Sequence, residues 1–161
     1  MTESINLKRF LDAQDGGTII DRNRTAYEVA LGEILGGEKT SHWIWYIFPQ
    51  VPFGTSEMAR RYAVSSRAEA TAFLQNKILR SRLLEIANAV ADTLSAGITP
   101  ETLMGSEIDC QKLASSMTLF KFIAAELDEH EIGHTTRSVL KQLANHGHAE
   151  CTRTLDWVKN F

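Results

Sequence analysis

Apolar residues recur every three or four positions along most of the chain, which is the spacing of one face of an α-helix. Capping residues such as Ser66 with Glu69 open several of these segments, and glycines such as Gly16-Gly17 and Gly97 follow their ends. Alternating strand patterns and Asn-Gly hairpin turns are missing. The sequence therefore predicts a mainly α-helical, multi-helix fold. The expected helices cover residues 7–14, 24–35, 56–62, 66–74, 79–94, 109–127, 136–144 and 150–159, with one further turn that starts at Pro100.

Residues 41–50, with the sequence SHWIWYIFPQ, interrupt this pattern because they are apolar on all faces. A run this short does not distinguish a buried helix from a buried strand. We favour a helix with Ser41 as its N-cap, and the strand stays open. The prolines at positions 49 and 52 remove backbone donors and disfavour helix in the residue before each. We therefore expect a rigid loop over residues 49–54.

The composition is that of an ordinary folded protein. The chain has 161 residues, of which 43% are hydrophobic and 23% are charged, so disorder and coiled coil are disfavoured. A chain of this length buries a continuous core without disulfides or metals. We expect one domain over residues 1–161.

The charge and the apolar runs limit the classes of partner. A formal net charge of -3 offers no excess of cations for nucleic acid, which we exclude as a partner. The apolar run from Trp43 to Phe48 is far too short to span a bilayer, and no basic and apolar leader is present at the N-terminus. We expect a cytoplasmic protein without a membrane partner. In that setting the two cysteines, Cys110 and Cys151, stay reduced. The sequence does not indicate an oligomeric state.

The first group of candidate site residues surrounds His42, with Trp43, Trp45 and Tyr46 beside it. An imidazole titrates near neutral pH, so a histidine in an aromatic wall is suited to general acid-base chemistry or to orienting a polar substrate group. The alternative is that the tryptophans are core residues and that His42 is half-buried and hydrogen-bonded. The spacing does not decide between these interpretations.

A second group, Asp109, Lys112, Ser115 and Ser116, lies in the predicted helix over residues 109–127. At 100° per residue, three of the four fall within about 60° of one another beside the apolar stripe of this helix. A polar ridge next to the core is therefore expected. A surface ion pair, and serines that bond back to the preceding turn, explain the same residues without a function.

The third group is a literal match to the zinc motif H-E-x-x-H, at His130, Glu131 and His134. On a helix this spacing places two imidazoles on one face to bind zinc, and the glutamate activates the metal-bound water. Arg137 and Leu140 occupy the positions where the extended metzincin pattern requires Gly and His, which excludes that class. The competing interpretation is an acidic loop between helices. We keep a zinc hydrolase as a second alternative.

The segment over residues 41–50 resembles the family catalogued as domain of unknown function 1810, whose members are sometimes mislabelled calpastatin. Further similar segments cover most of the chain in the order of the family: residues 10–14 (FLDAQ), residues 54–56 (GTS) followed by Ala59 and Tyr62, and residues 109–120 (DCQKLASSMTLF). The resemblance implies a mainly α-helical bacterial protein with no settled activity, cofactor or substrate. It also adds Asp12, Gln14 and Gln50 to the candidate site residues.

These observations lead to one hypothesis and two alternatives. We expect a pocket for a small polar metabolite, with a nucleotide-like molecule as one candidate. His42, Lys112 and Ser116 are its candidate catalytic residues, if the protein is an enzyme. The candidate ligand-binding residues are Asp12, Gln14, Trp43, Trp45, Gln50, Asp109 and Ser115. A non-catalytic protein-interaction module is the first alternative and the zinc site is the second.

Overall fold

Helices make up all the regular structure of residues 5–16 and 23–161, which are the residues that this computed structural model describes. No strand occurs in this part of the chain, as the sequence predicts. The helices are α1 (Lys8–Asp15), α2 (Ala26–Leu35), α3 (Ile44–Ile47), α4 (Glu57–Arg61), α5 (Arg67–Gln75), α6 (Lys77–Ser95), α7 (Pro100–Met104), α8 (Glu107–Leu127), α9 (His130–Asn145) and α10 (Thr152–Asn160).

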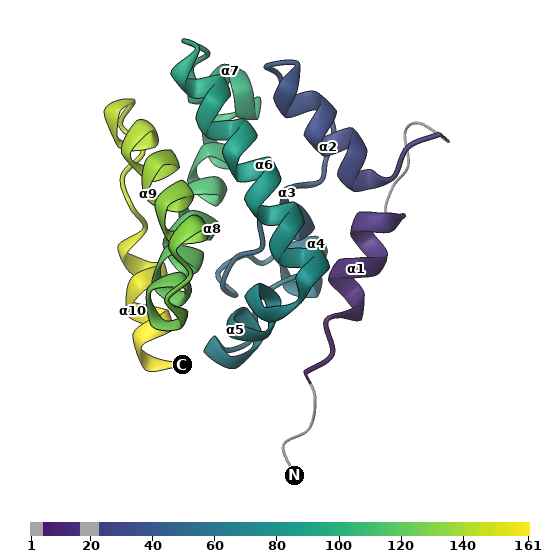
Figure 1. Cartoon of the computed structure of the whole chain (residues 1–161), viewed down its shortest axis with the longest axis vertical. Helices are drawn as coiled ribbons and strands as arrows, with labels where there is room; N and C mark the ends of the chain where they lie inside the picture. The colour runs from purple at the N-terminus through teal and green to yellow at the C-terminus, as the bar shows by residue number, and fades with distance from the viewer. Residues whose placement is uncertain (1–4, 17–22) are drawn as a thin grey trace.

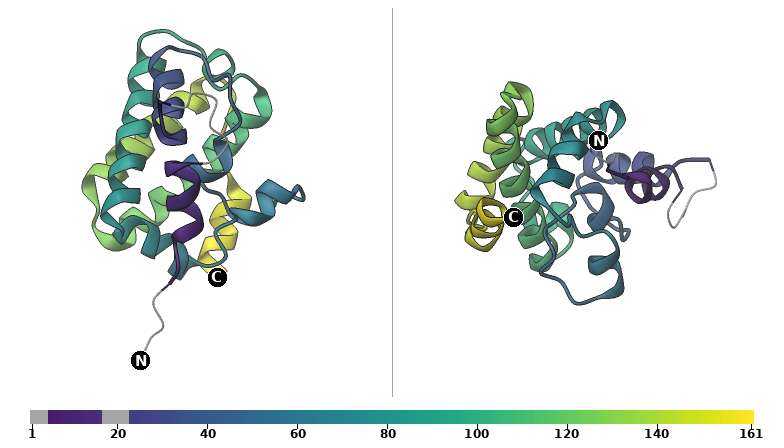
Figure 2. Two further views of the ribbon diagram at one scale, coloured as in Figure 1. Left: turned by 90° about the vertical axis from the view of Figure 1, so that its right-hand side faces the viewer. Right: turned by 90° about the horizontal axis from the view of Figure 1, so that it is seen from below.

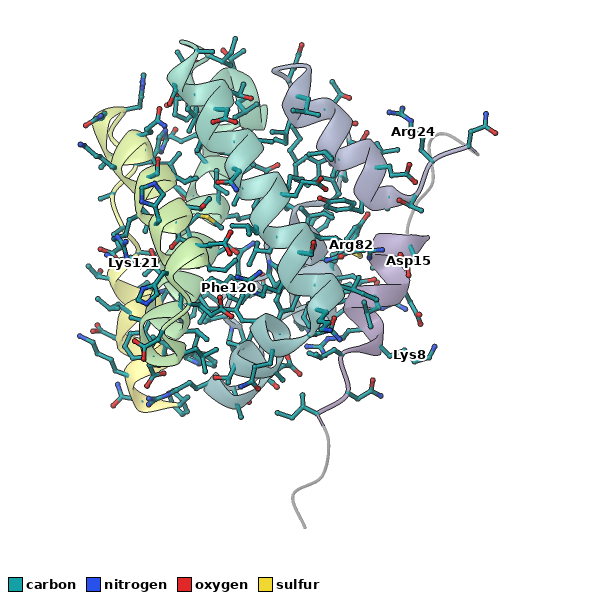
Figure 3. All side chains as sticks on the ribbon, in the orientation of Figure 1. Lys8, Asp15, Arg24, Arg82, Phe120 and Lys121 are labelled. Carbon is teal, nitrogen blue, oxygen red and sulfur yellow. The ribbon has the colours of Figure 1, made fainter. Side chains whose placement is uncertain are left out.

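Helix α8 lies at the centre of the bundle and packs against α3, α5, α7, α9 and α10. Its apolar stripe, which includes Leu113, Met117 and Phe120, is fully buried, and Figure 3 shows Phe120 in the interior. Helix α6 crosses the face of the bundle between α2 and α9 (Figure 1). The hydrophobic spacing of these two long helices therefore determines the single core of the described residues.

Side-chain caps open most of the helices. The hydroxyl of Ser66 accepts from the backbone N–H of Glu69, as predicted. The carboxylate of Glu69 completes no capping box; it accepts hydrogen bonds from Arg9 and from the backbone of Ser65. A full capping box occurs instead at Thr25 and Glu28. Side chains also cap α4, α6, α7 and α8, at Ser56, Asn76, Thr99 and Ser106.

Two further local predictions need correction. Ser41 is not the cap of the aromatic segment, because α3 begins at Ile44 and the hydroxyl of Ser41 donates a hydrogen bond to Glu33. The segment is helical only over Ile44–Ile47. The H-E-x-x-H residues do not lie in a loop between helices, because α9 begins at His130. Gly16 ends α1 as predicted, and Gly17 lies outside the described residues.

The loop over residues 49–56 leads from α3 to α4, which projects from the body of the bundle in both views of Figure 2. The loop is fixed by a hydrogen bond of 2.8 Å from the backbone N–H of Val64 to the carbonyl of Gln50. At Gly54 a Cβ would lie 2.4 Å from the Cβ of Ala59, so the loop passes too close to α4 for any side chain there. No helix in the described ranges is long and apolar enough to cross a bilayer.

Candidate functional site

A pocket of about 370 Å³ opens beside the aromatic segment, and we call it the aromatic pocket. Helix α2 forms one side of it, α4 contributes Met58, and the residues before and within α3 form the rest. This volume lies in the range of about 300–1,000 Å³ that is typical of small-molecule sites. Its lining residues are Ala26, Val29, Ser41, His42, Trp43, Trp45, Tyr46 and Met58.

The hydroxyl of Tyr46 and the ring of His42, both in the lining of the aromatic pocket, have no hydrogen-bond partner among the described residues. Tyr46 is only 3% exposed, and its hydroxyl forms no hydrogen bond within this part of the chain. Burial, with smaller contributions from Tyr62 and Glu33, raises the pKa of Tyr46 to about 12, so the hydroxyl stays protonated and able to donate. His42 is exposed at the rim, and its ring is likewise unpartnered. Both groups are therefore available to a ligand.

The carboxylate of Glu33, on α2, holds the start of the aromatic segment in place. It accepts hydrogen bonds from the backbone N–H groups of Thr40 (2.8 Å) and Ser41 (2.9 Å), from the hydroxyl of Ser41, and from the indole Nε1 of Trp43 (2.9 Å). Burial is the largest effect on Glu33 and raises its pKa, but these hydrogen bonds together outweigh burial and lower the pKa below its usual range. Glu33 therefore stays ionised and fixes the wall of the aromatic pocket.

Behind this wall lies a buried ion pair. The side chain of Lys39 is 5% exposed; its Nζ lies 2.9 Å from Asp109 on α8 and donates to the carbonyl of Ser41 at 2.6 Å. The same ammonium lies 4.9 Å from the ring centre of Trp43, within the range of a cation–π contact. Asp109 thus ties α8 to the aromatic segment.

A second, smaller pocket of about 40 Å³ adjoins the first, and we call it the Lys112 pocket. Trp45 lines both pockets, so they are neighbours. The Nζ of Lys112 lies 5.2 Å from the ring centre of Trp45 and 3.9 Å from Asp109. The indole Nε1 of Trp45 is buried and has no hydrogen-bond partner in the described part of the chain. The lining residues are Trp45, Gln50, Val51, Gly54, Ala59, Tyr62, Ala63 and Lys112.

The structure thus brings His42, Trp43, Trp45, Gln50 and Lys112 to two adjoining pockets. Asp109 lies next to them through its contacts with two lysines.

The two candidates on α1 lie elsewhere. Asp12 has a side chain that is 62% exposed and forms an ion pair with Lys8. Gln14 is buried and donates to the carbonyl of Tyr46 at 2.9 Å, while its own oxygen accepts from Arg82 of α6. Arg82 also pairs with Asp15, and Figure 3 shows these two side chains together. Gln14 therefore supports the backbone of a pocket residue from behind.

The two serines of α8 are buried and line neither pocket. The hydroxyl of Ser115 lies 2.7 Å from that of Thr154 on α10. The hydroxyl of Ser116 is buried without a hydrogen-bond partner among the described residues. No base is bonded to Ser116 there, so its catalytic role stays a prediction.

The H-E-x-x-H residues lie in the first turns of α9, and all three side chains are exposed. Glu131 lies 3.6 Å from Arg80 of α6. Within residues 5–16 and 23–161, no three His, Cys, Asp or Glu side chains are grouped so as to hold a metal ion.

Sequence reasoning missed Glu33 and Lys39, the residues that hold the aromatic segment. Glu33 belongs to a mostly apolar helix, and Lys39 stands in a polar turn, where a solvated side chain is the usual outcome. A signal for Glu33 existed in the run of donors at residues 40–43, which needs an acceptor once Trp43 is buried. Nothing in the sequence indicates that this acceptor is on α2.

Comparisons with known proteins agree with this architecture. The structure of the conserved hypothetical protein Rv1873 from Mycobacterium tuberculosis is similar to 96% of this chain and 97% of that chain, with 32% sequence identity and a TM-score of 0.74. No curated protein sequence matches the chain. The family model DUF1810, described as a protein of unknown function, matches residues 4–155. The resemblance found in the sequence is thereby confirmed, and the chain belongs to the DUF1810 family.

Proposed function

We propose that this protein binds a small molecule with a planar ring in the aromatic pocket. One observation carries the proposal: a pocket of about 370 Å³ has aromatic walls, together with an unpartnered Tyr46 hydroxyl and an exposed His42. Apolar walls with a few polar groups are typical of sites for small molecules. A nucleobase or nucleoside is of suitable size and shape.

The aromatic walls and the hydroxyl have different roles. The indole of Trp45, which is partly exposed, offers a face to a planar ring, and such contacts favour offset or edge-to-face geometry. The hydroxyl of Tyr46 donates a hydrogen bond to a nitrogen or oxygen of that ring and thereby selects rings with an acceptor. Glu33 holds Trp43 in place before the ligand arrives, which lowers the entropy cost of binding.

The surroundings of His42 indicate a role in ligand binding and not in acid-base catalysis. Catalytic histidines are normally oriented by a third group that bonds the second ring nitrogen. No described residue bonds the ring of His42. We therefore assign His42 to contact with the ligand at the rim of the pocket.

The arrangement also weighs against a protein-interaction module centred on the tryptophans. A hot spot for a partner protein needs aromatic side chains that the partner can reach. Trp43 is only 1% exposed, and Trp45, which is partly exposed, lines two concave pockets. A small molecule fits this geometry better than a second protein surface.

A thermal-shift screen against nucleosides, nucleotides, sugar phosphates and amino acids tests the proposal. A ligand that binds only the folded state stabilises it by about 2.7 kcal/mol when the ligand concentration is one hundred times Kd. This stabilisation raises the melting temperature. Val29→Phe fills the pocket and is expected to abolish the shift, whereas Tyr46→Phe removes one hydroxyl and is expected to weaken it. His134→Ala, on the distant start of α9, is the matched control and is expected to keep the shift.

Two results would contradict the proposal. One is the absence of a shift in the wild-type protein across the whole panel. The other is a shift of the same size in a folded Val29→Phe protein. Zinc belongs in the panel as well, because a zinc-induced shift that is lost in His134→Ala would favour the metal site on α9.

A further inference from the structure

The carboxylate of Asp109 has two ammonium groups within ion-pairing distance. Lys39 lies 2.9 Å from this carboxylate and is almost fully buried, so it takes up most of the negative charge. Lys112 lies 3.9 Å from the same carboxylate. No other carboxylate of the described residues lies within 4.0 Å of Lys112. Two ammonium groups therefore share one carboxylate, and one positive charge is left at the Lys112 pocket.

The surroundings of Lys112 make this charge effective. Its side chain is 28% exposed and its Nζ lies over the ring of Trp45, so water screens it less than a fully exposed lysine. Gln50 lines the same pocket, and its side-chain amide is able to donate hydrogen bonds. The wall at Gly54 is bare backbone, since a Cβ there would meet Ala59 at 2.4 Å. An anion that enters meets a cation and an amide.

The size of the Lys112 pocket limits what it holds. Its volume of about 40 Å³ is a few times the roughly 10–15 Å³ that a cavity needs to hold one water, so it excludes a ring and admits only a group of a few atoms. A carboxylate and a terminal phosphoryl group share the required chemistry, which is an anionic oxygen on a short stem. Trp45 lines both pockets, so they are separated by no more than one side chain.

We infer that the Lys112 pocket is an anion subsite, and that it binds the carboxylate or phosphate of the molecule whose ring occupies the aromatic pocket. The assignment of the ring rests on the proposed function. The charge argument for the subsite does not. The substrate class is therefore a planar heterocycle or arene with one short anionic arm.

The subsite is tested first without any ring, with inorganic phosphate and acetate as probes and sodium chloride at equal ionic strength as reference. The readout is the set of indole N–H signals of the isotope-labelled protein, assigned by Trp45→Phe and Trp157→Phe. An anion at Lys112 is expected to shift the Trp45 signal saturably. Trp157 is the control, because it stacks on Phe161 near another cation, Arg153. Its signal would report general binding of anions to the surface, and we expect its chemical shift not to change.

Lys112→Met removes the charge and keeps the stem, so it is expected to weaken the anion-dependent shift by about fivefold or more, as the loss of an ion pair worth about 1 kcal/mol requires. The matched control is Lys121→Met, on the same helix and 3.1 Å from Glu150. Figure 3 shows Lys121 on the side of the bundle where α9 and α10 lie. A Trp45 signal that does not move beyond the chloride reference, or that moves equally in Lys112→Met, would overturn the subsite.

Two matched pairs then separate the subsite from the proposed function: adenosine with adenosine monophosphate, and benzamide with benzoate. The anionic member of a pair is expected to bind more tightly by calorimetry, and Lys112→Met is expected to remove that advantage. Val29→Phe is expected to weaken every ring-bearing member. If neutral members bind and anions have no advantage, the subsite is wrong and the proposed function stands. If Val29→Phe has no effect while Lys112→Met does, the proposed function is wrong and the subsite stands.

Discussion

Trp43 and Trp45 are two positions apart, line the same aromatic pocket, and each lies under a lysine ammonium. Trp43 is 1% exposed, its indole N–H donates to Glu33, and its lysine is paired with Asp109 at 2.9 Å. Trp45 is partly exposed, its indole N–H has no hydrogen-bond partner among the described residues, and its lysine lies 3.9 Å from the same carboxylate.

The difference separates scaffold from binding surface. The indole N–H of Trp43, the carboxylate of Glu33 and the ammonium of Lys39 are all matched within the protein, which is the condition for a stable buried polar network. Around Trp45 a cation is only partly matched, and a buried N–H without a partner costs about 1–3 kcal/mol. Unmatched polar groups that persist beside a cavity are typical of functional sites. The predictions below test this division.

The largest expected loss of stability follows from replacing Asp109, the carboxylate that the two lysines share. Asp109→Asn leaves Lys39 buried without its counter-charge and is expected to lower the free energy of unfolding by about 3 kcal/mol. Lys112→Met removes the more exposed partner and is expected to lower it by less than about 1 kcal/mol. Urea unfolding of the three proteins measures both values. Equal losses would contradict the division.

The two tryptophans themselves are the next comparison. Trp43→Phe leaves Glu33 short of one donor and opens a cavity, so a loss of about 2–3 kcal/mol is expected. Trp45→Phe removes an N–H that is already unpaired, and a loss of about 1 kcal/mol is expected. Thermal or urea unfolding distinguishes these values. A greater loss for Trp45→Phe would show that Trp45 is the scaffold residue.

A smaller, pH-dependent effect is expected at Glu33. The pKa of Glu33 in the folded protein lies below the pKa of an ordinary glutamate. The ionised carboxylate therefore stabilises the folded protein fully at any pH above the ordinary pKa. This stabilisation is lost as the pH falls through the pKa that Glu33 has in the folded protein. The difference in melting temperature between the wild type and Glu33→Gln is therefore expected to be constant above about pH 5 and to narrow below it. Glu38→Gln, in the exposed turn that follows α2, is the matched control. A difference that widens on acidification would contradict the assigned pKa direction.

The long helices were predictable from the sequence because the signals for them, apolar spacing and capping residues, lie within each helix or at its ends. The spacing of Leu113, Met117 and Phe120 and the cap at Ser66 depend only on neighbours along the chain. The aromatic segment was not predictable in the same way. It is apolar on all faces, so its structure depends on Glu33, Lys39 and α8, which approach it only in the folded protein.

The candidate site was predictable in part for the same reason. His42, Trp45 and Lys112 carry the right chemistry in short motifs, and the structure places them at adjoining pockets. No local pattern indicates that Ser115 faces Thr154, because Thr154 lies on another helix, α10. The pairing of Asp12 with Lys8 is different, because the two residues are four positions apart on α1 and this spacing can be read from the sequence.

The most direct test is a crystal structure of the protein with the molecule that raises its melting temperature most. We expect its ring between Trp45 and Tyr46, with an anionic oxygen within hydrogen-bonding distance of the Lys112 ammonium. A ligand bound elsewhere, for example in the groove of Phe53 and Trp157 near the C-terminus, would contradict the assignment of the aromatic pocket.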